Sequence, residues 1–136
     1  MKSFRLKSVL VVLFLSIGFV SCSNDDDNNT PAPTTKAALV TEIKGPVTGK
    51  VNDELSYDVT YVVDNACAEF DKISEVTIGS EKGLQVIAKY PSEVCTQQVP
   101  DPKKTVYKFS SKVKGTFEIK FKKSETEFLT QKVVIE

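Results

Sequence analysis

Three cysteines and a run of three aspartates are the residues of this chain that could do more than pack or solubilise. The chain contains no histidine, so the commonest general base and the commonest metal ligand are both missing. Cys67 and Cys95 are too far apart for a Cys-x-x-Cys redox motif, and the sequence offers no further ligands for a zinc site. No paired acid and base stands out among the carboxylates. We therefore predict a protein that is not an enzyme and has no catalytic residue, metal or cofactor.

Cys22 follows a segment with the organisation of an export signal. Residues 1–8 carry three positive charges, and residues 9–20 form an apolar run of 12 that only a serine and a glycine interrupt. That run is shorter than the ~20 residues of a membrane-spanning helix. Cleavage after Ser21 by ordinary signal peptidase is disfavoured, because bulky Phe19 would occupy a position that requires a small residue. We predict that residues 1–21 are a signal peptide of another type.

The stretch Gly18-Phe19-Val20-Ser21-Cys22 resembles a bacterial lipobox, in which an apolar, a variable and a small residue precede a lipidated cysteine. Leucine is usual where Phe19 stands, and such relaxed boxes resemble those of Bacteroidota lipoproteins. The resemblance implies lipid on Cys22 and an anchor in the outer membrane, on the cell surface or on the periplasmic face. Two or more acyl chains would make the anchor stable. The alternative is an unlipidated secreted protein.

The segment after Cys22 has the composition of a tether. Residues 23–35 include no large apolar side chain, so we predict that the lipidated cysteine and linker, residues 22–36, stay disordered. Asp25, Asp26 and Asp27 are interpreted either as a solubilising spacer or as an export signal, since they resemble the acidic signal that sends Bacteroidota lipoproteins to the cell surface. A calcium loop is disfavoured, because the glycine and glutamate of an EF-hand are missing at the required spacing.

From residue 37 to residue 136 the sequence alternates apolar and polar residues in short runs separated by turn residues, which is typical of half-buried strands. No amphipathic helix of useful length is apparent. The strands that we expect lie at 39–44, 55–63, 73–79, 84–90, 107–109, 117–121 and 127–135. About seven strands at this spacing predict one all-β domain, a two-sheet antiparallel sandwich.

Two strand motifs resemble those of a known family of β-sandwich domains. Gly115-Thr116-Phe117-Glu118-Ile119, after Tyr107-x-Phe109, resembles the strand pair near the end of bacterial immunoglobulin-like domains. The resemblance implies an immunoglobulin-like sandwich over about 90 residues. It departs from true immunoglobulins, because Phe117 stands where a corner tyrosine is expected and the chain has no tryptophan.

Cys67 and Cys95 are predicted to form a structural disulfide, because the leader places them outside the cytoplasm. Closing a loop of this length contributes about 3.5 kcal/mol in the chain-entropy model. Both cysteines follow predicted strand ends, so we expect the bond to join two loops, 64–72 and 91–104, at one end of the domain. Loops on a rigid scaffold often carry function, and we expect a binding surface there.

Charge is unevenly distributed along the domain. Residues 52–81 have a net charge of −7 and residues 103–123 have a net charge of +7, although the whole chain is neutral. One hypothesis is a basic patch that binds an anionic ligand; its members would be Lys108, Lys112, Lys114, Lys120 and Lys122. The other is pairing within the chain, since an immunoglobulin-like order sets the second strand beside the fifth and the third beside the sixth. Without an overall basic excess, nucleic acid is not an expected partner.

These features favour a membrane-anchored, surface-exposed binding or adhesion module. A structural or accessory subunit of a cell-envelope complex and a protease-inhibitor-like module are the alternatives. Besides membrane lipid at Cys22, the partner left open is a protein or an anionic glycan, and the sequence does not define an oligomeric state.

Overall fold

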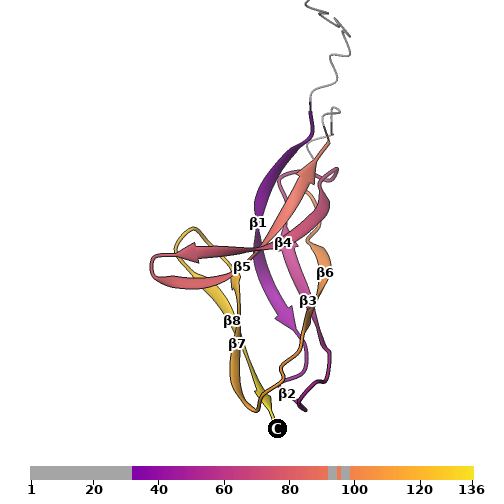
Figure 1. The fold of residues 1–136 in the computed structure, drawn as a ribbon. Coiled ribbons are helices and arrows are strands. Elements are labelled where there is room, and N and C mark those ends of the chain that lie inside the picture. The colour runs from indigo at the N-terminus through magenta and orange to yellow at the C-terminus, as the bar shows by residue number, and fades with distance from the viewer. Residues whose placement is uncertain (1–31, 92–94, 96–98) are drawn as a thin grey trace, which may run out of the picture.

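The computed structural model describes residues 32–91, 95 and 99–136; the predicted signal peptide, Cys22 and the aspartate run lie outside these residues. All regular elements of the described part are β-strands (Figure 1), so the all-β prediction is confirmed. They are β1 (Thr34–Lys44), β2 (Thr48–Gly49), β3 (Leu55–Val62), β4 (Glu69–Ile78), β5 (Glu81–Tyr90), β6 (Lys103–Phe109), β7 (Gly115–Lys122) and β8 (Phe128–Ile135). Among the described residues no helix is long and apolar enough to cross a membrane.

Strand β1 links the two main groups of strands. Its first residues pair with β5, from Thr34 opposite Tyr90, and its later residues pair with β3, as far as Lys44 opposite Asp58. The partner changes between Ala38 and Leu39, and an irregularity in the β1–β3 register follows at Thr41. Because bulges increase local twist, this region lets the sheet curl (Figure 1). The strands β4, β5, β1, β3 and β6 thus form one antiparallel run.

The complete sheet is mixed, and the prediction of a purely antiparallel arrangement is wrong. Strand β2 runs parallel to β8, with Thr48 opposite Val134, and β5 meets β7 in parallel at one pair, Leu84 and Phe121. Residues 45–47 connect β1 to β2 and place β2 beside β8. The amide of Val134 donates to the carbonyl of Val47 at 2.9 Å in this region.

The predicted strand neighbours are half right. The second expected strand lies beside the fifth, as the seven-residue β3–β6 ladder. The third does not lie beside the sixth: β4 pairs with β5 instead. These two strands are joined by a tight turn at Gly79, whose φ of 61° suits glycine, so the local hairpin replaces the long-range pairing.

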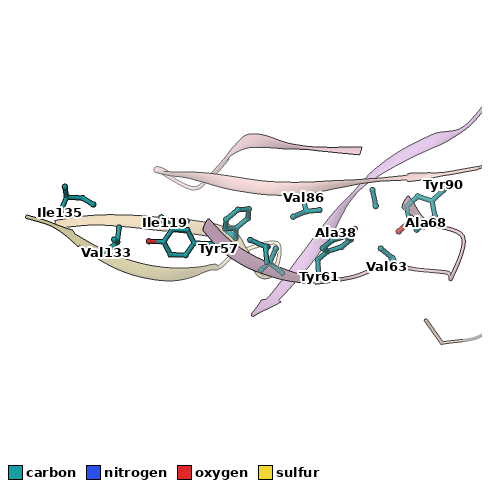
Figure 2. Close-up of a cluster of buried hydrophobic side chains, with 14 residues drawn as sticks. Ala38, Tyr57, Tyr61, Val63, Ala68, Val86, Tyr90, Ile119, Val133 and Ile135 are labelled. Atoms are coloured by element: carbon teal, nitrogen blue, oxygen red, sulfur yellow. The ribbon is translucent and has the colours of Figure 1, made fainter. Parts of the chain in front are cut away.

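The core follows the predicted alternation of side chains. On β3, Tyr57, Val59 and Tyr61 are buried and the residues between them are not. The same buried cluster includes Ile119 and Phe121 on β7, Val133 and Ile135 on β8, and apolar side chains of β1 and β5 (Figure 2). This cluster fixes the positions of the surrounding strands, because fully burying such side chains is worth about 1.5–3 kcal/mol each.

The folded part begins earlier than predicted. Strand β1 starts at Thr34, whereas the expected linker extended to residue 36 and the expected domain began at 37. The first residues of β1 are exposed, but their backbone pairs with β5 and Lys36 forms an ion pair with Asp64 at 2.9 Å. The composition of residues 34–36 does not indicate a strand, because backbone pairing at a strand end does not require apolar side chains.

Candidate functional site

The predicted disulfide is confirmed: Cys67 and Cys95 are bonded, with their Cα atoms 6.0 Å apart. The bond joins the loop before β4 to the segment between β5 and β6. Lys103, the first residue of β6, donates from Nζ to the carbonyls of Ala66 and Ala68, which holds the same loop.

Strand β1 begins at this end of the molecule (Figure 1). Thr34 pairs with Tyr90 only five residues before Cys95. The described chain therefore enters β1 at the disulfide end of the domain. Residues 92–94 and 96–98 of the loop expected to bind a partner lie outside the described part.

The five lysines of the predicted basic patch do not form one surface of unpaired charge. Lys108 pairs with Glu54 at 2.6 Å and Lys122 with Glu125 at 2.8 Å. Lys120 lies 3.2 Å from Glu81 and 3.3 Å from Glu118. Three of the five are therefore ion-paired within the chain. The Lys108–Glu54 and Lys120–Glu81 pairs join the basic segment to the acidic one, as the intramolecular hypothesis predicts, whereas Lys122–Glu125 is a local pair. Exposed pairs such as Lys108–Glu54 add about 0–1 kcal/mol to stability.

The other two lysines, Lys112 and Lys114, are exposed in the link between β6 and β7. Within the described part of the chain neither has an acidic partner. The link itself is ordered by a local turn, in which the hydroxyl of Ser111 donates to the carbonyl of Val113 and accepts from its amide.

A notch of about 230 Å³ opens between the β4–β5 hairpin and the strands β6 and β7. Its apolar lining comes from Leu84 on β5, Tyr107 and Phe109 on β6 and Ile119 on β7. Charged side chains surround this lining: Glu75, Lys82, Glu118 and Lys120. The volume is below the roughly 300–1,000 Å³ of small-molecule sites, so the notch suits a side chain or a short segment better than a cofactor.

The sheet topology explains why the notch exists. β5 and β7 pair only at Leu84 and Phe121, so they separate on the N-terminal side of this contact. Across the notch, β6 forms a ladder with β3 and, among the described residues, with no other strand. The curled sheet therefore comes close to closing between β6 and β7 without backbone pairing between them.

Aromatic side chains join β6 to β7 in place of a ladder. The rings of Tyr107 and Phe121 meet edge to face, with centroids 5.4 Å apart and an interplanar angle of 85°. Phe109 and Phe117 form a second pair at 5.5 Å. Such pairs contribute about 0.5–1.5 kcal/mol beyond area burial. They hold the floor of the notch in place, so the site is preformed.

Electrostatic contacts close one side of the notch. Lys120 lies between Glu81 of β5 and Glu118 of β7 and so spans the point at which these strands separate. Its hydrogen bond to Glu81 and its contact with Glu118 raise the pKa of Lys120. Lys120 is a cation at neutral pH, and its ion pair with Glu81 connects β7 to β5 across the gap; this connection is called the Lys120 latch. Burial raises the pKa of the Tyr107 phenol above its ordinary value.

This site is not predicted by the sequence. The sequence places Tyr107 and Phe109 on a strand and Lys120 in a basic patch, and of the site residues predicted from it only Lys120 lines the notch. The available signal was the pair of aromatic residues Tyr107 and Phe109 on one short strand. Comparison of the chain with protein-family models, curated proteins and solved structures finds no match in any of the three. The interpretation of the notch therefore depends on its geometry.

Proposed function

We propose that this chain is a lipid-anchored, non-enzymatic binding module of the outer membrane, and that the notch receives an apolar side chain of a protein partner. One observation carries the proposal: an apolar floor with a charged rim opens to solvent on strands that the core holds rigid. A few polar groups around an apolar floor are the usual composition of a recognition site. Display on the cell surface is part of the proposal and depends on Asp25, Asp26 and Asp27 acting as an export signal.

The proposed scaffold is a variant of the immunoglobulin-like two-sheet sandwich. Support comes from the β3–β6 ladder and the antiparallel β7–β8 hairpin, which both match the strand neighbours expected in such domains. The β4–β5 hairpin is the departure, because β4 makes no ladder with β7. The notch lies beside this hairpin, where the arrangement differs from the expected order.

The anchor is tested by removing its thiol. We expect Cys22→Ala to lose the incorporation of labelled fatty acid that the wild-type protein shows in growing cells, because no acyl chain can then be attached. Fatty-acid labelling of this variant at the wild-type level would refute the anchor without affecting the notch.

The notch is tested by a photo-cross-linking residue at position 82, on its rim, and by the same residue at position 132, on the exposed face of β8. We expect a discrete cross-linked protein band in intact cells from position 82 only. A second change, Leu84→Asn, should remove the band because it makes the floor polar.

Leu129→Asn is the matched control for Leu84→Asn. Both leucines are partly buried and pack against the core, but only Leu84 lines the notch. Equal loss of the band in both variants would indicate general damage to the fold and contradict a specific role of the notch.

A further inference from the structure

The strand β6 has one neighbour where an interior strand has two. All seven of its residues pair with β3, and among the described residues it forms no ladder on its other side. An unpaired strand edge presents a row of N–H and C=O groups that can pair with another chain. The register of β6 with β3 is continuous, without the bulge that interrupts β4 at Asp71. It is thus a regular template for an additional strand.

The side chains of β6 define what an added strand would meet. Thr105, Tyr107 and Phe109 are partly buried on the side that lines the notch. A residue directly opposite one of them would point the same way and contact the aromatic floor. Apolar side chains at every second position would fill this space, because successive side chains of a strand point to opposite faces.

The other face of β6 is basic. Lys104 and Lys108 are exposed there, on either side of Val106, which is 53% exposed. No acidic residue occurs between Lys103 and Phe117, so the positive charge continues through Lys112 and Lys114. Lys104 has no acidic partner in the described part of the chain, and the exposed Lys108–Glu54 pair is weak enough to be rearranged. Acidic residues on an added strand would therefore be favoured on this face.

The neighbouring edge of β7 is less suitable for a new strand. Leu84 of β5 already pairs with β7 at Phe121. The Lys120 latch connects the two strands just before that point. An added strand on β7 would have to displace both contacts, whereas on β6 it would displace no backbone partner.

We infer that the notch takes an extended segment of a partner protein, which adds to the sheet as a strand beside β6 and alternates apolar with acidic side chains. This inference rests on the proposed binding function and specifies its partner. Backbone pairing would supply general affinity, and the alternating side chains would supply specificity. The floor would select the apolar residues, and Lys104 and Lys108 would select the acidic ones.

The test supplies such a strand within the chain. A Gly/Ser linker and an eight-residue segment that alternates valine and glutamate are appended to Glu136 of the full-length protein in detergent micelles, since a tethered segment has a high effective concentration. We expect at least tenfold slower hydrogen exchange at the amides of β6 that β3 does not bind. The midpoint of thermal unfolding should rise as well.

Two control segments separate pairing from charge. A segment with proline at every second position should give no protection, because proline has no N–H to donate. A segment that alternates valine and lysine should protect less than the glutamate version. The combined change Lys104→Glu and Lys108→Glu should reverse this preference, and it changes only exposed residues.

Protection on β4 or β8 instead of β6 would overturn the inference, and so would equal protection by the glutamate and lysine segments. Failure of the inference is distinguishable from failure of the proposed function. A cross-linked partner at position 82 without β6 protection would leave a binding module whose ligand is not an added strand. Absence of any cross-linked protein at position 82 would instead contradict the proposed binding function.

Discussion

Tyr57 and Tyr107 are the same residue type at directly opposed positions of the β3–β6 ladder, yet they occupy different environments. Tyr57 is 0% exposed, and its hydroxyl donates to the carbonyl of Pro46 at 2.9 Å. Tyr107 is only partly buried and lines the notch. The difference comes from the strands that carry them, because β3 lies between β1 and β6 whereas β6 has β3 alone.

This comparison shows that the alternation of side chains and the residue type do not determine whether an apolar surface is covered by a neighbouring strand. β3 and β6 both direct aromatic side chains inward, but only β3 has a neighbour on each side. The region around Tyr57 is therefore a structural core, whereas the region around Tyr107 has the same chemistry and remains accessible. An accessible apolar region held in place by a core is what a docking site requires.

Alanine at each of the two tyrosines tests the contrast most strongly. Tyr57→Ala should lower the free energy of unfolding by about 3–5 kcal/mol, because it leaves a cavity in a closed core. Tyr107→Ala should cost less than half as much, since its site is already open to solvent. Denaturant titration of the full chain in micelles measures both values, and equal losses would refute the contrast.

Removing the disulfide tests whether the stability of the strands that line the notch depends on this covalent bond. Cys67→Ser with Cys95→Ser should lower the free energy of unfolding by about 3.5 kcal/mol, because the 28-residue loop is no longer closed in the unfolded chain. The bond joins the segments that lead into β4 and β6, so hydrogen exchange should accelerate there more than in β7 and β8. Uniform acceleration in all strands would contradict this localisation.

Two glycines allow the same comparison with a single methyl group. A Cβ at Gly45 would clash with the ring of Tyr57, and a Cβ at Gly83 would clash with the ring of Phe128. Tyr57 is fully buried and cannot move aside, so Gly45→Ala should cost about 1–3 kcal/mol. Phe128 is partly exposed and can rotate, so Gly83→Ala should cost less. Thermal unfolding of both variants measures the difference, and a larger loss at Gly83 would contradict the account.

The smallest expected effect concerns alkaline pH. Burial raises the pKa of Tyr57 and of Tyr107 above 10.0, the ordinary value for tyrosine. Folding therefore favours the neutral phenols, and this contribution is fully present below pH 10 and is lost as the pH rises through the folded-state values. Tyr107→Phe should make the loss of stability above pH 10 less steep, which denaturant titrations at several pH values measure. An unchanged slope would indicate that Tyr107 does not contribute.

Part of this architecture could be predicted from the sequence. The alternation of Tyr57, Val59 and Tyr61 identified a strand and its buried face, and the predicted disulfide between Cys67 and Cys95 is present. The strand follows from a local pattern of side chains, and the disulfide follows because no third cysteine lies in the domain. A single sequence therefore contains enough information to predict both.

The parallel contacts and the notch could not be predicted in the same way. The pattern of Tyr107 and Phe109 shows which side chains point inward, but it does not show whether another strand lies beyond them. Likewise, the run of lysines does not reveal that Lys120 lies between Glu81 and Glu118, because that depends on how β5 approaches β7. Long-range strand order decides both features.

The central claim is that a partner's strand completes the edge of β6, and hydrogen exchange in the native membrane tests it most directly. The protein is labelled with deuterium in isolated native membranes and, in parallel, after purification in detergent. The account predicts that peptides covering β6 exchange slowly in native membranes and rapidly after purification, whereas those covering β3 exchange slowly in both. Identical exchange of β6 in the two preparations would contradict it.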